Sequence, residues 1–539
     1  MNSLIKALKK LKAVTKLQVI IGLIFIVFLA TRLILNTGLV NCQSQDDGMY
    51  LASSMKLANG NLIFPRDFIF ANHVNPSWIP YSRVGMVFPT ATFIKVFGVN
   101  DFATTFFSFM SSVLIFFLLL ELCKNFFKKD RCIKIIAVLL LTFFPLNVVY
   151  STRIMPEMPL VLFTGLAILF FIYGTNRKND LFLIFSGISI GLAYLVKESA
   201  IISLAIFPLY YIFLSKNKKD VFKFGYVIMG FVLIFLLETA YFYKETGFPF
   251  YRISLIKKAH MEKMGFEYGL THPSYTIGFL NLFYPNGYDF FQHFKSMINT
   301  FPLSSDFIPY GYLFILTFLS IPYIIFFKKR EAYFLILWFL VFYLYLEFGF
   351  TDVFLQKNGS QYVVNYFFVF KETDSSKLLN ILTLPSILLA SYFLIKSPTV
   401  LRVFLIVLLV LTSAIAIEKN YSLLKDGMKD TKEAAMILKD LPAKTVYTDY
   451  LAVGQINYFL ADSYSGNFID VRSTLPFNVK DGYVVVGGAR GCDITGNHVT
   501  DSVPEFALNP PTEWILIGEI PGKTTWYRSQ NMKMYYVPK

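Results

Sequence analysis

Long apolar runs of membrane-spanning length recur along this chain and constrain its fold more than any other feature. The first, residues 19–35, is interrupted only by Thr31 and Arg32 near its end. About 20 apolar residues carry a helix across the hydrocarbon core of a bilayer, because each residue adds about 1.5 Å. Backbone amides in lipid must be satisfied within their own segment, so the runs predict helices. With 55% hydrophobic and 16% charged residues, the chain is predicted to be an α-helical polytopic membrane protein.

About 11 transmembrane helices are predicted from these runs. They cover residues 18–37, 104–122, 133–150, 158–174, 181–196, 199–214, 224–243, 308–327, 332–348, 378–395 and 401–417. The first run lacks a small-residue cleavage site, so we interpret it as a retained span and not as a signal peptide. Lys197 and Glu198 alone separate the fifth span from the sixth, which predicts a tight hairpin there.

Basic residues fix the predicted orientation. Lysines and arginines gather before the first span, after the second, fourth, sixth and eighth, and between the tenth and eleventh. The positive-inside rule makes all these segments cytoplasmic. We therefore expect a protein of the cell (plasma) membrane with a cytoplasmic N-terminus and an extracytoplasmic C-terminal domain. The formal charge of +15 is then explained by loops that face anionic headgroups, and we predict no nucleic-acid partner.

The segments on the predicted outer side are long, whereas the cytoplasmic ones are short, so chemistry has room only outside. Residues 1–420 are predicted to form the membrane domain, with outer loops 42–103 and 244–306, and residues 421–539 a soluble α/β domain. In that domain we predict a helix over 430–441 and strands over 445–447, 467–471, 483–487, 514–517 and 532–537. The glycine-rich stretch 487–491 fits a turn better than an anion cradle, because no clear helix follows it.

Two adjacent carboxylates, Asp46 and Asp47, follow the first span closely and precede Tyr50 by a few residues. Paired carboxylates near a membrane surface are costly unless a cation or a reaction lies nearby. The local pattern alone slightly favours a solvated turn closed by Gly48. Other charges on the predicted outer side favour a site.

These other charges lie on the predicted outer side, most of them at the ends of spans and Arg83 within the outer loop 42–103. They are Arg83, Arg153, Glu157, Lys197, Glu198 and Lys377. Any one of the cations, taken singly, is best explained by its side chain reaching the lipid headgroups. Arg153 and Glu157 could share a helical face at their four-residue spacing, although Pro156 and Pro159 oppose a continuous helix. The convergence of cations and carboxylates on one side predicts an anion-binding, acid–base site.

At these positions the chain resembles the lipid-donor glycosyltransferases of the GT-C fold, the group of protein O-mannosyltransferases and aminoarabinose transferases. Asp46, Asp47 and Tyr50 are similar to the Asp-Glu-x-x-Tyr motif, with aspartate in place of glutamate. Further similarities follow in the family's order: residues 57–60, Pro89 leading to Phe97-Gly98, Pro145, Arg153 with Glu157, and residues 191–197. Motifs carry the resemblance over residues 18–215, and architecture carries it beyond. The family's late Arg-Tyr pair appears here as Lys377-Leu378, and the absence of Trp-Trp-Asp-Tyr-Gly argues against an oligosaccharyltransferase.

The resemblance implies transfer of a sugar from a polyprenyl (dolichyl or undecaprenyl) phosphate to an extracytoplasmic protein, lipid or glycan acceptor, with inversion and without a required metal. Such transfer needs a base for the acceptor hydroxyl and cations for the departing phosphate. We predict Asp46 as base, assisted by Asp47. The predicted phosphate ligands are Arg83, Arg153, Lys197 and Lys377, and the predicted orienting residues are Tyr50, Glu157 and Glu198. Whether the paired carboxylates also bind Mg²⁺ or Mn²⁺ stays open.

A transporter of a lipid-linked or small anionic substrate is the alternative. Transporters hold charges at the bilayer midplane on interrupted helices arranged in internal repeats. Arg32 and Glu238, which lie inside predicted spans, are the residues that such a protein would use. Most acidic residues lie instead at span ends, and the sequence has no apparent repeat. A receptor with a sensing tail would leave the clustered outer charges unexplained.

Overall fold

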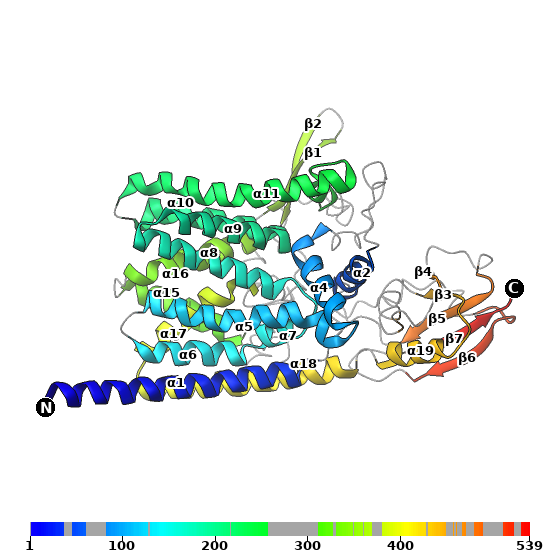
Figure 1. Cartoon of the computed structure of the whole chain (residues 1–539), viewed down its shortest axis with the longest axis horizontal. Helices are drawn as coiled ribbons and strands as arrows, with labels where there is room; N and C mark the ends of the chain where they lie inside the picture. Colours follow the sequence, from blue (N-terminus) through cyan, green and yellow to red (C-terminus); the bar gives the residue numbers. More distant parts are fainter. Residues whose placement is uncertain are drawn as a thin grey trace.

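The computed structural model describes a helical bundle beside a small C-terminal sheet (Figure 1). The described residues are 2–36, 46–60, 82–127, 130–215, 217–256, 311–326, 330–348, 350–358, 361–368, 380–426, 429–448, 456, 460, 466–470, 479–488, 510–521 and 530–539. We call the end of the bundle from which α18 leads to the sheet the sheet end. The chain alternates between this end and the opposite one, where the turns between α5 and α6 and between α8 and α9 lie.

The first half of the chain supplies most of the bundle. Its α-helices are α1 (Asn2–Ile34), α2 (Asp46–Ala58), α4 (Val84–Phe97), α5 (Asp101–Phe126), α6 (Arg131–Phe143), α7 (Pro145–Ser151), α8 (Glu157–Arg177), α9 (Asp180–Val196), α10 (Ile206–Leu209) and α11 (Phe224–Thr246). Two 3₁₀ segments, η3 (Glu198–Ala205) and η5 (Lys218–Lys223), and a π segment, η4 (Tyr210–Leu214), complete it. Asparagine side chains cap two of the helices: Asn100 accepts from the Ala103 amide at α5, and Asn179 from the Leu181 amide at α9.

Glycines let α9 and α11 approach closely. A Cβ atom on Gly187 would lie 1.9 Å from the Val227 carbonyl oxygen, and one on Gly230 would lie 2.1 Å from that of Ile184. Any larger residue would therefore push the two helices apart. This close contact sets the position of α9 relative to α11, and with it the position of the Lys197–Glu198 turn that follows α9.

Among the described residues, four helical segments are long and apolar enough to cross a membrane: Lys16–Ile34, Asp101–Phe126, Glu157–Arg177 and Lys218–Thr246. The third predicted span is instead a bent pair, α6 and α7, which meet at 58°. Shorter apolar helices occupy the positions of the other predicted spans. The mostly helical fold with several apolar spans is confirmed, and the count of 11 stays a prediction.

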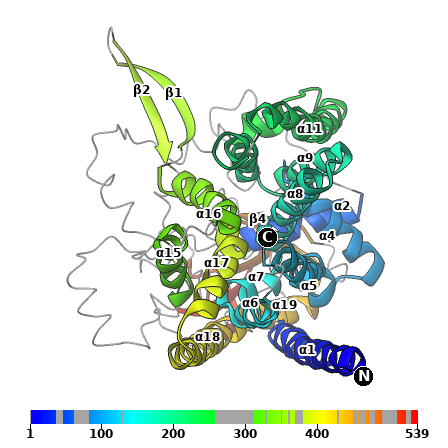
Figure 2. The same ribbon diagram turned by 90° about the vertical axis from the view of Figure 1, so that its left-hand side faces the viewer.

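The second half of the bundle contains α15 (Gly311–Phe326), α16 (Arg330–Phe348), α17 (Thr383–Lys396) and α18 (Thr399–Asp426). Between α16 and α17, strands β1 (Phe350–Asn358) and β2 (Gln361–Phe368) form an antiparallel hairpin that the sequence did not predict. Figure 2 shows this hairpin reaching away from the bundle. In the same view, α1 and α18 lie on either side of α6 and α7, and both contact them.

The C-terminal unit is a five-stranded sheet with α19 (Lys429–Lys439) on one face. Its strands are β3 (Thr445–Thr448), β4 (Phe468–Asp470), β5 (Gly482–Gly488), β6 (Ile515–Ile520) and β7 (Gln530–Val537), in the order β4-β3-β5-β7-β6. β4, β3 and β5 are parallel, and β7 is antiparallel to both of its neighbours. Alternate residues fill two cores: Val485 packs on the side of α19 and Val484 on the other. The predicted helix and all five predicted strands are confirmed.

Candidate active site

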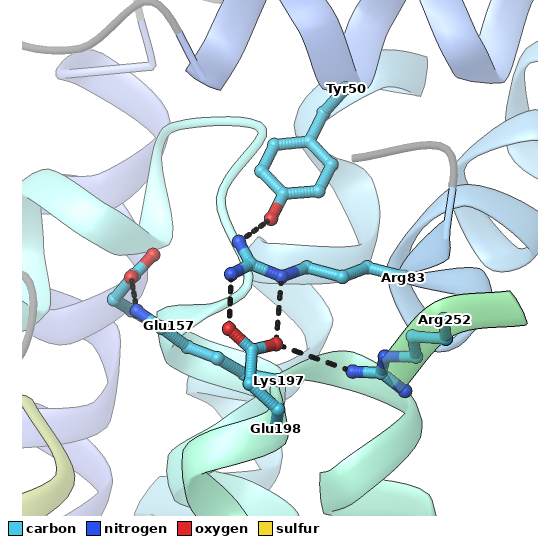
Figure 3. Close-up of polar contacts among 6 residues, drawn as sticks. All are labelled: Tyr50, Arg83, Glu157, Lys197, Glu198 and Arg252. Carbon is cyan, nitrogen blue, oxygen red and sulfur yellow. Dashed lines mark hydrogen bonds and ion pairs between the residues drawn. The ribbon is translucent and has the colours of Figure 1, made fainter. Parts of the chain in front are cut away.

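A buried arginine and a glutamate form the centre of a charged network at the sheet end (Figure 3). Arg83, immediately before α4, donates from Nε to Glu198 Oε2 at 3.1 Å and from Nη2 to Glu198 Oε1 at 2.6 Å. This two-point contact is the strongest geometry that a guanidinium and a carboxylate adopt. The Arg83 side chain is 10% exposed and that of Glu198 is 26% exposed, so the pair lies at the edge of the buried region.

Two further side chains extend the network on opposite sides of this pair. The third arm of Arg83, Nη1, donates to the Tyr50 hydroxyl, which ties α2 to α4. Arg252, in the helical turn after α11, reaches Glu198 Oε2 at 3.4 Å through Nη2 and Glu238 Oε1 at 2.7 Å through Nη1. Its guanidinium also lies over the Tyr194 ring, 4.6 Å from the centroid. One carboxylate, Glu198, is thus shared by two guanidiniums.

Backbone geometry at the α9–η3 junction places two neighbouring side chains in separate contacts. Lys197 is extended, with φ −155° and ψ 131°, so α9 stops at Val196 and a new helical segment begins at Glu198. The change from an extended Lys197 to a helical Glu198 sends the two side chains to different partners. Lys197 Nζ accordingly pairs with Glu157 Oε1 at 2.9 Å, next to the Arg83–Glu198 contact. Both members of this second pair are buried, and Glu157 opens α8 directly after Pro156.

The charge state of Glu198 follows from its neighbours. Burial by itself would raise the pKa of this carboxyl, but the guanidiniums of Arg83 and Arg252 hold its pKa well below the usual range. Glu198 therefore stays ionised at physiological pH. It is suited to orienting cations and not to exchanging protons.

Five of the predicted site residues meet in these two contacts: Tyr50, Arg83 and Glu198 in one, and Glu157 and Lys197 in the other. Arg153 lies on the buried turn before α8, near the Tyr150 ring, and does not share a helical face with Glu157. α7 ends at Ser151, and α8 begins directly after Pro156 with Pro159 in its first turn, so no continuous helix joins Arg153 to Glu157.

The structure describes less of the predicted base, Asp46, and nothing of one predicted cation, Lys377. Asp46 and Asp47 are the first residues of α2, where the local pattern had slightly favoured a turn. The structure describes their backbone and not their side chains. Lys377 lies outside the described residues.

Arg252 and Glu238 are members of the network that sequence reasoning did not assign to it. Arg252 stands in a long outer segment without any motif, so nothing marked it. Glu238 was marked as a charge inside a span, which is a functional signal by itself. The role of Glu238 is to pair with Arg252: the two side chains are in contact at 2.7 Å, and both are buried.

Comparison with known families decides the class of protein. Residues 85–242, from the start of α4 into α11, match the family model of the dolichyl-phosphate-mannose-protein mannosyltransferases. The chain is a membrane glycosyltransferase whose residues 85–242 are similar to this family. The matched stretch contains Glu157, Lys197, Glu198 and Glu238 and ends ten residues before Arg252. The predicted enzyme class, which uses a polyprenyl-phosphate sugar, is confirmed in place of the transporter alternative.

The fold is similar to that of two crystal structures of ArnT from Cupriavidus metallidurans. The apo structure gives a TM-score of 0.59 at 12% identity, over 97% of this chain and 98% of ArnT. The structure bound to undecaprenyl phosphate gives 0.57 at 10% identity, over the same shares. At these identities the likeness shows the fold, which is of the predicted GT-C type and includes both bundle and sheet. No curated protein matches the chain.

Proposed function

We propose that this glycosyltransferase binds the phosphate of its polyprenyl-phosphate donor at the Arg83–Glu198–Arg252 network and transfers the sugar on the extracytoplasmic side of the membrane. The observation that carries this proposal is one partly exposed carboxylate held between two buried guanidiniums. A departing polyprenyl phosphate gathers negative charge and needs fixed cations around it. A phosphate beside Glu198 would meet both arginines without a large movement of either.

Lys197 and Arg153 supply positive charge next to this network. Glu157 fixes the Lys197 ammonium through the buried 2.9 Å contact, and Arg153 lies on the turn that leads into Glu157. Arginine matches phosphate with two parallel donors, whereas lysine acts as a point charge. We assign Arg83 and Arg252 to hold the phosphate, and Lys197, Arg153 and Lys377 to balance its remaining charge.

Asp46 is the proposed base for the acceptor hydroxyl. It lies four residues before Tyr50 on α2, and one helical turn advances about 5.4 Å. Because Tyr50 is bonded to Arg83, this spacing puts the backbone of Asp46 one helical turn from a residue that contacts the proposed phosphate site. The acceptor oxygen bonds to the anomeric carbon as the carbon–phosphate oxygen bond breaks. The proton passes to Asp46, the electron pair leaves with polyprenyl phosphate, and the sugar inverts.

The predicted orientation in the membrane determines on which side the reaction takes place and which acceptors it can reach. We place the sheet end outside the cell, which makes the acceptor an extracytoplasmic protein, lipid or glycan, and we assign the 421–539 unit to acceptor binding. We propose that no metal is required. Should a chelator abolish turnover, Asp46 and Asp47 are the carboxylates that would hold Mg²⁺ or Mn²⁺.

The test is release of polyprenyl phosphate from labelled polyprenyl-phosphate sugars by purified protein, with and without EDTA. We expect turnover of one donor, unchanged by EDTA, and a loss of about 100-fold or more in Asp46→Asn, where 100-fold is the lower end of the range for a general base. Asp47→Asn is the matched control and should retain more activity. Turnover that survives Asp46→Asn would move the base elsewhere, and no release from any donor, even with cell extract supplying acceptors, would overturn the proposal.

A further inference from the structure

Arg32 is the only charged residue in the first predicted span, 18–37, and its side chain is fully buried. A guanidinium near a helix end ordinarily reaches out to lipid headgroups. Arg32 points inward from α1 to the junction of α6 and α7. Burying an unpaired charge is strongly unfavourable, so the site must satisfy this side chain in another way.

All five N–H groups of Arg32 donate to uncharged oxygens. A guanidinium has five such donors and no acceptor. They reach Ser112 Oγ (3.2 Å), the carbonyl oxygens of Phe28 (3.2 Å), Thr142 (3.3 Å) and Leu141 (3.2 Å), and Asn147 Oδ1 (2.5 Å). The guanidinium also lies 3.5 Å from the centroid of the Phe28 ring. The side chain is saturated, which leaves it no donor for a ligand.

Two of these acceptors, the carbonyls of Leu141 and Thr142, are available to Arg32 because the third predicted span is broken. Pro145 has no N–H, so the carbonyl of Leu141, four residues earlier, has no helical partner. α6 ends at Phe143, and α7 departs at 58°. Arg32 donates to the carbonyls of Leu141 and Thr142, at the end of α6. The arginine of α1 thus completes a helix end that the proline left open.

The same acceptors connect the break to the turn that carries Arg153. Asn147 Oδ1 also accepts from Ser112, and its amide donates to Met158 Sδ in the first turn of α8 at 3.2 Å. Ser108, one turn from Ser112 on α5, donates to the Met155 carbonyl at 3.0 Å. The C-terminal end of residues 152–156 is therefore held, through Met155 and the nearby Met158, by Ser108 and Asn147.

We propose that Arg32 is a positioning residue, which locks the α6–α7 break and thereby holds the Arg153–Glu157 turn in the geometry that transfer requires. Arg32 does not touch the substrate. Only the kinetic part of this inference rests on the proposed function, because the position of the turn can be measured without turnover.

The first experiment reads the position of the turn directly. Thr152→Cys, in a chain whose four native cysteines are serine, is labelled with a membrane-impermeant maleimide. Thr152 is buried, so the parent should react slowly. Arg32→Met should speed labelling by about tenfold, because the turn opens locally. Thr31→Val is the matched control, since the Thr31 hydroxyl bonds to Val27 in its own helix, and it should label like the parent.

Asn147 gives a second, milder pair of variants in case Arg32→Met does not fold. Asn147→Asp keeps an acceptor for Arg32 and should label slowly, whereas Asn147→Ala should label fast. Slow labelling in folded Arg32→Met or, if that variant is lost, in Asn147→Ala would overturn the inference.

Kinetics separate positioning from a merely structural role. In folded Arg32→Met, kcat should fall by about 100-fold, the size expected for a displaced catalytic group, while KM for the donor changes by less than about threefold. Arg32→Lys should recover part of kcat. An unchanged kcat in a protein with fast labelling would contradict the inference, whereas absent turnover in the wild type would refute only the proposed function.

Discussion

Arg32 and Arg83 are both buried guanidiniums at the same end of the bundle, and their partners differ in kind. Arg32 is satisfied by fixed, uncharged oxygens, two of them at the end of α6. Arg83 is satisfied by a tyrosine hydroxyl and by a carboxylate that it shares with Arg252. The first set cannot change partners without opening a helix end. The second includes Glu198, which is 26% exposed, and we propose that the donor phosphate binds beside it.

Burial of a charge therefore does not by itself identify a ligand site. Two carboxylates, Glu198 and Glu238, balance Arg83 and Arg252, so this region is near neutral and yet holds its cations in fixed positions. Preorganised cations stabilise developing charge without reorganising when the reaction occurs. Variants in the two regions should consequently differ in which kinetic constant they change.

The largest effect is expected from Arg83→Gln. It removes the two-point contact with Glu198 and one proposed phosphate ligand, so kcat/KM should fall by about 1000-fold, the upper end for one preorganised donor. Arg83→Lys restores the charge without the planar fork and should recover only part of the loss. Steady-state release of polyprenyl phosphate measures both. If Arg83→Gln kept wild-type kcat/KM, Arg83 would be as remote from the donor as Arg32, and the distinction between the two arginines would be lost.

Glu198→Gln tests the shared carboxylate through stability. It leaves two buried guanidiniums short of an anion, which should cost about 3 kcal/mol, near the lower end for breaking a buried pair because Glu198 is partly exposed. Because folding lowers the pKa of Glu198, its contribution is complete above the ordinary value of about 4.5 and is lost as pH falls below it.

Melting temperatures of the wild type and Glu198→Gln across pH 7 to 3 provide the measurement. The difference in melting temperature between the two proteins should be largest at neutral pH and should decrease as the pH is lowered. A gap that grows as pH falls would mean that Glu198 is not held ionised by the arginines.

Glu238→Gln should have a smaller effect, because Arg252 keeps its contact with Glu198. We expect kcat/KM to fall by about tenfold, as for a supporting partner that orients a binding group. Glu121, which pairs with Lys124 on the last turns of α5 at the opposite end, offers the matched control. Glu121→Gln should be neutral in the same assay. Equal losses in both variants would show a general effect of removing carboxylates from the bundle.

Asp481→Asn should have the smallest effect. Just before β5, pairing with Lys444 lowers the pKa of this partly exposed carboxyl and raises that of the lysine. Exposed ion pairs contribute little to stability. Donor turnover should stay within about twofold of wild type, since such surface changes are usually near neutral. A large loss of donor turnover would instead tie the sheet to the phosphate site.

Sequence reasoning placed the C-terminal strands and most of the bundle helices because their apolar patterns have clear periods, but it did not predict α2 and α4 in the outer loop 42–103. It also assigned Arg83, Glu157, Lys197 and Glu198 to the site, because charged residues on the outer side of an apolar chain are easily recognised. It did not assign Arg252 to the site, because contacts between distant segments leave no local pattern. Arg32 was marked as a charge in a span, but its role depends on the carbonyls that Pro145 frees across the bundle. The β1–β2 hairpin was missed because its apolar residues follow another apolar run directly.

The decisive test of the phosphate site is the affinity of undecaprenyl phosphate for purified protein in lipid nanodiscs, measured for the wild type, Arg83→Gln and Arg32→Met. We expect Arg83→Gln to raise Kd by about tenfold or more, the cost of a lost charge-assisted contact, and folded Arg32→Met to change it by less than about threefold. Unchanged affinity in Arg83→Gln would contradict the assignment of the phosphate site to the Arg83–Glu198–Arg252 network.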